Sequence, residues 1–572
     1  MKCVVMTRRG HVKMIPAQAI SKYSLLGAAG TQAQNIQRDL LKQIDKTTLD
    51  IGLQPYHVEI PIWDFKLLEK TTMQFPIHPI HELCAAIYSC GEEVFADFFL
   101  GSDGHAALEK FWANTAHAPW SRDHPVRDKP HLLPFTVPIT EHGDEGLYCK
   151  NDGDCVLVRS IHGELTELMS DLTRLLESAL PCAIICEGTI EALIAAQEWG
   201  WECAYQGIWP VLDHLRRPIT EATGRHRFAR RGEFLAGPYR FAYAGSLGDW
   251  KYLKEVWHLA DHYNADCCCH KCRAHKKNPA LLFTDTGPDA GWAGTVYSND
   301  DFWQKHTDIP PPLKRRKGSH VELVRGDVQH TGHLGVTKII NAQCIVDLSN
   351  EGFFGPIALP LSVRLRSAYV GFKAWCRSNR ICCSQPAFTV SRLNVNRSFD
   401  FPEFASLAKS HNMRVVAAWV ADVCSMAAKD NVNSRYQQLR AVCAWAHAEF
   451  YSAMEQAPRY LSAAQANRIS EAGATFLRTY NTLRKLAELD ARPAWAIRPK
   501  FHQLDHMCLD VARDRYNPRF YHCYADEDFV GRIMRISRRC HKRCVGRRCL
   551  QLWQLRLRAL ISKKHRDKSA RK

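Results

Sequence analysis

Three carboxylates that are far apart in the chain each stand where a predicted strand ends or a predicted helix begins. Asp144 follows an apolar run, Asp249 follows the run at 241–244 and a glycine-rich turn, and Glu527 opens a predicted helix near the end of the sequence. Phosphoryl transfer by two divalent ions uses such carboxylates, brought together from distant segments to hold Mg²⁺ or Mn²⁺. The three acids therefore predict a catalytic site that binds Mg²⁺ or Mn²⁺.

Each acid also has an ordinary structural role open to it. Asp144 suits a turn, Asp249 suits the N-cap of a helix, and Glu527 suits the positive end of a helix dipole. Asp526 and Asp528 flank Glu527. The choice of the third acid therefore stays open, as does the choice between catalytic and structural roles.

Soft and borderline metal ligands occur at short spacings between the second and third acids. Cys269 and Cys272 form a CxxC pair, and His330 and His333 follow Asp327 in a DxxHxxH pattern. Cysteine and histidine are the ligands of tetrahedral zinc sites. We predict a structural Zn²⁺ bound by Cys269, Cys272 and His330. Competing ligands are His262, Cys267, Cys268 and His270, and a cluster of buried thiols beside a separate polar loop is the alternative.

The composition favours a globular protein with a polyanionic partner. The 572 residues are 46% hydrophobic and 10% aromatic, enough for substantial cores, and the formal net charge is +17. Clustered Lys and Arg bind phosphate backbones with release of counterions, so DNA is the first partner to test. A basic soluble protein without a nucleic-acid partner is the alternative.

The distribution of cysteine predicts an intracellular protein. The count is odd, at 23, and several cysteines lie inside helix-like runs such as 441–445. That pattern fits reduced thiols better than a disulfide framework. The first 20 residues lack the apolar stretch of a signal peptide, and no apolar run reaches the length of a membrane span. We therefore expect neither a secreted nor a membrane-spanning protein, and no membrane partner.

The elements that must position these residues alternate between strand and helix in the middle of the chain. Residues 132–139 and 155–158 predict a hairpin, and 241–244 predict a later strand. Helical periodicity covers 31–46, 80–112, 165–180 and 189–199, with a short strand at 182–186. This order is typical of an α/β domain.

A long helical block follows from 336 to 490, in which Trp375, Trp419 and Trp445 are predicted to be core. Before it, Lys314 to Lys317 form a basic cluster in a loop, either a nuclear import signal or phosphate contact, or a solvated linker. After the block, an amphipathic helix carries basic side chains that we expect to contact DNA phosphates, a solvated helix end being the alternative. These basic residues are Arg532, Arg535, Arg538, Arg539, Lys542 and Arg543.

The order of these motifs resembles the DDE transposases of CACTA and related cut-and-paste DNA elements, especially the transposase-like proteins abundant in dinoflagellate genomes. The resemblance covers roughly 132–560 and depends on four short motifs. They are His142-Gly143-Asp144, Gly248-Asp249 ahead of a helix and the CxxC pair, Asp327-x-x-His330-x-x-x-Leu334-Gly335, and Glu527-Asp528-Phe529-Val530-Gly531-Arg532.

The resemblance implies an α/β fold with a large all-α insertion, namely a ribonuclease-H-like catalytic core interrupted by a helical block. By matching position, Asp144, Asp249 and Glu527 would be the metal-holding acids, and Asp327 and His330 would be the DxxH signature. His333 falls on a position that the family pattern leaves free.

We therefore predict four regions: a mainly helical region (1–125), the first part of the core with the Cys/His cluster (126–335), the helical insertion (336–495), and the last core segment with a basic tail (496–572). The predicted function is Mg²⁺-dependent DNA cleavage and strand transfer in the nucleus. The alternatives are a non-enzymatic nuclear DNA-binding protein derived from a transposase, and a zinc-stabilised interaction protein without nucleic acid. Formation of a homo-oligomer stays open.

Overall fold

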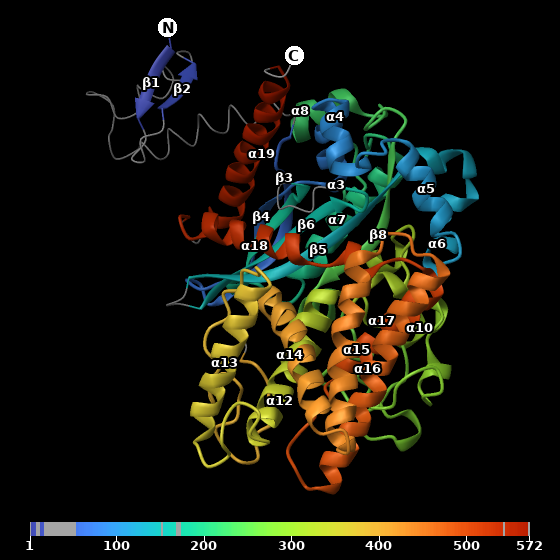
Figure 1. The fold of residues 1–572 in the computed structure, drawn as a ribbon. Coiled ribbons are helices and arrows are strands. Elements are labelled where there is room, and N and C mark those ends of the chain that lie inside the picture. The colour runs from blue at the N-terminus through green and yellow to red at the C-terminus, as the bar shows by residue number, and fades with distance from the viewer. Residues whose placement is uncertain are drawn as a thin grey trace.

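The computed structural model describes residues 2–6, 12–16, 53–149, 153–166, 173–405, 407–540 and 544–569. It has two bodies, a mixed α/β part and a helical block beneath it (Figure 1). The helix predicted at 31–46 lies outside the described residues. Within the described part of the chain, no helix is both long and apolar enough to cross a membrane.

A four-stranded sheet lies at the centre of the α/β part. Its order is β7 (Leu175–Pro181), β6 (Asp154–Gly163), β5 (Thr136–Cys149) and β8 (Arg240–Gly248). β5, β6 and β7 pair antiparallel, whereas β8 pairs parallel with β5. The predicted hairpin, the late strand and the α/β class are confirmed.

Two predictions about this sheet are wrong. Residues 165–180 were expected to form a helix, but the chain forms β7, and the strand expected at 182–186 is a 3₁₀ turn, Cys182–Ile184. All seven residues of β7 are buried, because α19 (Val545–Ser569) covers it. A strand buried on both faces lacks the polar alternation that distinguishes it from a buried helix.

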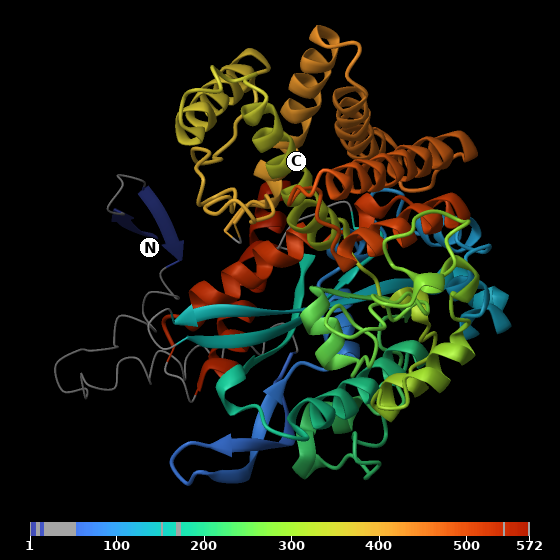
Figure 2. The same ribbon diagram turned by 90° about the horizontal axis from the view of Figure 1, so that it is seen from below.

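The region before the sheet contains an unpredicted hairpin as well as the expected helices. β3 (Tyr56–Asp64) and β4 (Glu69–Ile77) pair antiparallel, on the side of the sheet away from the helical block (Figure 2). Phe99 packs on Phe241 of β8 with ring centroids 5.4 Å apart. The region from 53 onward therefore shares one core with the sheet, with no division at the predicted boundary of 125.

The expected helical segments here are confirmed. They are α3 (Ile80–Ser89), α4 (Glu92–Phe95), the π-helical η3 (Ala96–Leu100), α5 (Ala106–Asn114) and α7 (Thr189–Gln206). The short helix α6 (Pro119–Arg122) was not predicted. Between α7 and the helical block lie α8 (Glu221–Arg230), α9 (Trp250–Val256), α10 (Asn299–Lys305) and α11 (Pro311–Arg315). The last two fall in a stretch that was predicted to be loop.

The predicted helical block is confirmed and has a hydrophobic core of its own. It consists of α12 (Thr337–Asn350), α13 (Leu361–Ser378), α14 (Ser410–Asp430), α15 (Arg435–Gln456), α16 (Ala463–Leu489) and also α17 (Pro499–Asp514), which lies beyond the predicted boundary at 495. Trp419 is buried as predicted, but Trp445 is 54% exposed. After α17 the chain returns to the sheet, where α18 (Tyr524–Ser537) packs on β5.

The basic cluster at 314–317 is not simply a solvated loop. Arg316 is 6% exposed and donates hydrogen bonds to Glu141 of β5 at 2.9 Å and to Glu198 of α7. Its guanidinium also stacks over Tyr243 of β8 at 4.5 Å. Arg316 therefore ties the segment before the helical block to the sheet, while Arg315 and Lys317 are exposed.

Replacing Arg316 with Ala should destabilise the fold, because it leaves Glu141 and Glu198 without their shared partner in a buried setting. We expect a loss of about 3–5 kcal/mol in the free energy of unfolding, measured by urea denaturation. Arg315→Ala is the matched control and should change little. Equal stability of the two variants would contradict the structural role of Arg316.

Candidate active site and metal centre

Asp144 and Asp249 lie side by side at one edge of the sheet. In the parallel pair of β5 and β8, Gly143 is in register with Gly248, so the two acids are the next residues on neighbouring strands. Asp249 is the N-cap of α9, where its Oδ1 accepts a hydrogen bond from the backbone N–H of Tyr252 at 2.7 Å. Asp249 therefore has the helix-capping role that the sequence suggested, and the cap uses one of its two carboxylate oxygens.

The three adjacent acids of α18 have different surroundings, which distinguish their roles. Asp526 is buried and accepts two hydrogen bonds from Arg174, at 2.8 and 2.9 Å, with His162 of β6 at 3.2 Å. Asp528 is exposed. Glu527 lies 3.3 Å from His330 and is partly open to solvent. Of the three, Glu527 is therefore the acid on the side of Asp144 that is free to bind a ligand.

His330 connects the DxxH motif to the third acid. Its Nδ1 lies 2.8 Å from Asp327 Oδ2, and its Nε2 lies 3.3 Å from Glu527 Oε1. Burial disfavours the charged imidazolium, but Asp327 and Glu527 outweigh burial and raise the pKa of His330 well above its ordinary value. Burial also opposes ionisation of Asp327, yet His330 and two backbone N–H groups lower its pKa to about 2. Asp327 and Glu527, on either side of the ring, therefore favour the protonated form of His330.

Of the three predicted acids, Asp144 is the one whose ionisation is least favourable. Burial raises its pKa well above the ordinary value, and the negative charges of Glu527 and Asp249 raise it further, while His330 lowers it. The charges of Asp249 and Glu527 thus act on Asp144, which indicates that the three predicted acids lie near one another, although among the described residues they do not form a group whose ligand atoms all lie within 4.8 Å. Carboxylates that repel one another in a partly buried site are the arrangement that a divalent cation stabilises.

The other groups around these acids are mainly histidine and lysine. His142, on β5 two residues before Asp144, is buried, and both its ring nitrogens lack a hydrogen-bond partner among the described residues. Lys500 of α17 donates to the backbone carbonyl of His330 at 2.8 Å, and the charge of Asp249 acts on it. The site therefore receives groups from the sheet, from the DxxH segment and from both α17 and α18.

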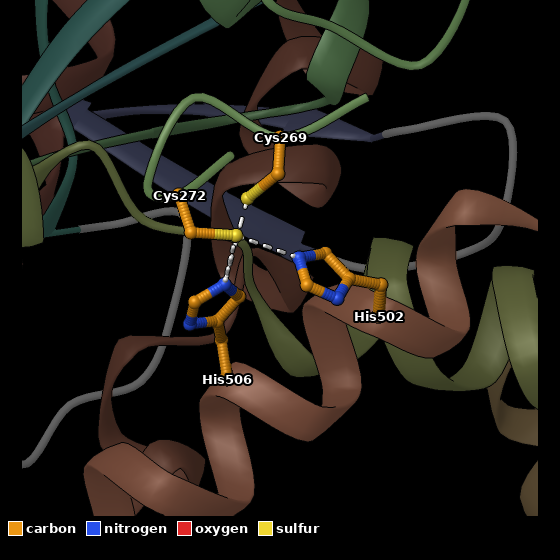
Figure 3. A group of neighbouring side chains, drawn as sticks. All are labelled: Cys269, Cys272, His502 and His506. Carbon is orange, nitrogen blue, oxygen red and sulfur yellow. Dashed lines mark hydrogen bonds between the residues drawn. The ribbon is translucent and has the colours of Figure 1, made fainter. Parts of the chain in front are cut away.

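A separate group of four buried ligands contains the predicted CxxC pair. Cys269 and Cys272, from the segment after α9, face His502 and His506 of α17, and their ligand atoms all lie within 4.8 Å of one another (Figure 3). Cys272 Sγ is 3.2 Å from His502 Nε2, and Cys269 Sγ is 3.5 Å from His506 Nε2. Ligands of a tetrahedral zinc site are separated by about 3.5 Å, given its Zn–S and Zn–N bond lengths. This group can therefore hold a metal ion.

The ligand set lacks one member predicted from the sequence and has two that were not predicted. His330 is held by Asp327 and Glu527 in the acidic site, and the structure brings His502 and His506 to the cysteine pair instead. The spacing of His502 and His506, four residues apart on one helix, places both rings on the same face and was the available signal. Their distance from the CxxC pair, 230 residues in the case of Cys272 and His502, concealed the connection.

The surroundings of Cys269 favour a thiolate, whereas burial and the neighbouring Cys269 raise the pKa of Cys272 well above its ordinary value. The backbone N–H groups of Lys271 and Ala274 donate to the sulfurs of Cys269 and Cys272 at 3.3 and 3.4 Å. Burial opposes ionisation of Cys269, but a hydrogen bond with Cys272 and the nearby histidines lower its pKa well below the ordinary value. Trp292 packs against both histidine rings, at 4.3 and 4.9 Å between centroids. The centre is thus closed to water, as in structural rather than catalytic zinc sites.

The predicted basic residues that the structure describes lie on α18 and in the turn directly after it. Arg535, Arg538 and Arg539 are exposed, and Arg532 is half-buried. Lys542 and Arg543 lie outside the described residues. The exposed arginines thus lie at the C-terminal end of the helix whose first turn carries Glu527.

Comparison with known proteins gives no identification. No protein-family model matches the chain, and no curated protein matches it. The geometry of the two sites is therefore the basis for a functional proposal.

Replacing Asp144 with Asn should stabilise the protein in the absence of divalent ions, because it removes repulsion with Asp249 and Glu527. The cost of ionising Asp144 is absent below the ordinary pKa of an aspartate and grows as pH rises towards its raised pKa. In EDTA we expect the melting temperature of the variant to exceed that of wild type by about 1–2 °C at neutral pH, and by less near pH 5. Asp528→Asn should leave it unchanged, and a lower melting temperature for Asp144→Asn would contradict repulsion.

Metal analysis can test the Cys/His centre. After gel filtration without added metal, the protein should retain about one zinc per chain. Cys272→Ser and His506→Ala should lose it, because each removes a ligand of the closed centre, while His330→Ala should retain it. A folded protein without zinc would refute the centre, and zinc loss in His330→Ala would restore the ligand set predicted from the sequence.

Proposed function

We propose that the protein is a DNA-cleaving and strand-transferring enzyme of the DDE transposase class, in which Asp144, Asp249 and Glu527 hold Mg²⁺ or Mn²⁺. The observation that carries the proposal is the convergence of these three acids from β5, from the end of β8 and from α18.

The topology of the sheet supports the proposal. An antiparallel meander of three strands followed by a strand parallel to the first, in the order β7-β6-β5-β8, is what a ribonuclease-H-like core would have. The first acid lies on β5, the second directly follows the parallel strand β8, and the third lies on a helix that packs on the same sheet. The helical block interrupts this unit between β8 and α18, as the resemblance implies.

Bound divalent ions would supply an activated water or hydroxyl for attack on a phosphodiester and would stabilise the leaving oxygen. The chain's own residues would hold and orient these ions. Asp249 keeps one oxygen for the cap of α9, so its other oxygen would bind. His330 would orient Glu527, which its Nε2 contacts, and Asp327 holds the other side of the His330 ring. Asp526 fixes the helix that carries Glu527, through Arg174.

The Cys/His centre would hold a structural zinc in this proposal. It joins the segment that follows α9 to α17, which is the last helix before the chain returns to Glu527. A tetrahedral ion at this junction would fix both ends of the helical block relative to the sheet. Zinc would thus maintain the acidic site without taking part in the reaction.

DNA is the proposed substrate, and the nucleus is the proposed location. The net charge of +17 favours a polyanion, and Arg535, Arg538 and Arg539 are exposed in the last turn of α18 and directly after it. Phosphate contacts from these side chains would hold a DNA backbone without reading its sequence. Action as a homo-oligomer is compatible with the proposal, since strand transfer joins separate DNA segments.

The test is nicking of supercoiled plasmid in Mg²⁺ or Mn²⁺. Asp249→Asn and Glu527→Gln should each reduce the rate by more than about 100-fold, because each removes a metal-binding carboxylate. Asp528→Asn, which changes the exposed neighbour of Glu527, is the matched control and should nick at the wild-type rate.

Wild-type protein that binds DNA with a steep salt dependence but never nicks it would support instead the non-enzymatic DNA-binding alternative. Absence of DNA binding, with zinc present, would leave only the zinc-stabilised interaction protein. Nicking that persists in both Asp249→Asn and Glu527→Gln would refute the proposed site.

A further inference from the structure

A third group of metal-capable side chains lies beside the acidic site and differs from it in chemistry. Asp327, His330 and Cys523 each offer a ligand atom, and these atoms lie within 4.8 Å of one another. Asp327 is the N-cap residue of the π-helical segment η11 (Val328–Val336), and Cys523 is the N-cap residue of α18. The three ligands thus come from two element ends that meet at the return of the chain to the sheet.

The thiol gives this group its selectivity. A carboxylate and an imidazole suit many divalent ions, but a thiolate favours zinc or cobalt over Mg²⁺ and Mn²⁺, which prefer oxygen ligands. One carboxylate, one imidazole and one thiolate leave a fourth tetrahedral position for water. The group is therefore suited to thiophilic ions, unlike the carboxylates of Asp144, Asp249 and Glu527.

The position of Cys523 couples it to the third acid. The backbone N–H of Glu527 donates to the carbonyl of Cys523 at 2.8 Å, so the two residues are the ends of one helical turn. His330, a second member of the group, lies 3.3 Å from Glu527. An ion bound by Cys523 and His330 would change both contacts that set the position of Glu527.

Access to the group is from the acidic site. Asp327 and Cys523 are fully buried, whereas the side chains of His330 and Glu527 are 15% and 28% exposed. An ion would therefore pass Glu527 and His330 to reach the thiol. Binding converts the Cys523 thiol to a thiolate and the protonated His330 to a neutral imidazole, and it releases both protons to solvent.

We propose that Asp327, His330 and Cys523 form a second, weaker site for a thiophilic divalent ion, zinc above all, and that its occupation opposes the reaction of the acidic site. The binding part of this inference stands by itself. The inhibitory part rests on the proposed function, because it needs a reaction to inhibit.

Cobalt titration of the zinc-loaded full-length protein tests the binding part. A thiolate bound to Co²⁺ gives a charge-transfer absorption in the near ultraviolet, and we expect it to appear with wild type and to be lost in Cys523→Ser and Asp327→Asn. Cys508→Ser changes another buried cysteine, on α17, and should keep the signal. Exchange of cobalt into the Cys269 and Cys272 centre would give a signal that survives in Cys523→Ser. That outcome, or no signal in wild type, would overturn the proposal.

Each variant is first checked for its retained zinc and melting temperature, so that loss of the signal is not loss of the fold. Should Cys523→Ser fail this check, equilibrium dialysis of wild type against excess zinc decides: about two ions per chain are expected if the second site exists, and about one if it does not.

The inhibitory part is measured as the ratio of nicking rates with and without added zinc, at fixed Mg²⁺. We expect added zinc to lower the wild-type rate at least tenfold, and to have a smaller effect in Cys523→Ser. Equal inhibition of both proteins would overturn the regulatory role. A protein that never nicks DNA would contradict the proposed function instead. The cobalt signal would still show whether the second metal site exists.

Discussion

The buried salt bridge between Arg174 and Asp526 is the interaction on which the acidic site depends. Arg174 immediately precedes β7 at one edge of the sheet, and Asp526 is in the first turn of α18, 352 residues later. The bridge is fully buried and has two hydrogen bonds, which makes it costly to break once formed. Because successive residues of a helix point about 100° apart, fixing Asp526 towards the sheet directs Glu527 towards His330 and Asp144. A rotation of α18 would remove the third acid from the site.

The Cys/His centre also helps to fix where α18 returns to the sheet. The sheet ends at β8 and is not rejoined until α18, so the helical block must return the chain to the correct place. One pair of ligands lies soon after β8 and the other lies shortly before α18. The two links differ in kind. One is an ion pair between the sheet and α18, and the other joins the segment after β8 to the segment before α18.

Much of this arrangement could be predicted from the sequence, and the failures have physical reasons. Asp144 and Asp249 each stood at the end of an apolar run, and the order of motifs pointed to Glu527 as the third acid. Only the structure distinguishes Glu527 from its neighbour Asp526, which is buried beside Arg174. β7 was assigned to a helix because a strand covered by α19 shows no alternation. His502 and His506 were separated from their cysteines by the whole helical block, and Arg316 belonged to a basic run whose burial nothing local indicates. Contacts between distant segments, rather than local propensity, decided each of these cases.

The long interval between the two halves of the Cys/His centre also affects how the chain is made. Cys272 precedes His502 by 230 residues. At a synthesis rate of about 5–20 residues per second, its thiol would wait about 10–50 seconds on the ribosome before the first histidine partner emerges. During that interval the nascent chain carries an unsatisfied cysteine pair that is open to oxidation or to capture of the wrong metal. The centre thus becomes complete only late in biosynthesis, and a prematurely terminated chain could never assemble it.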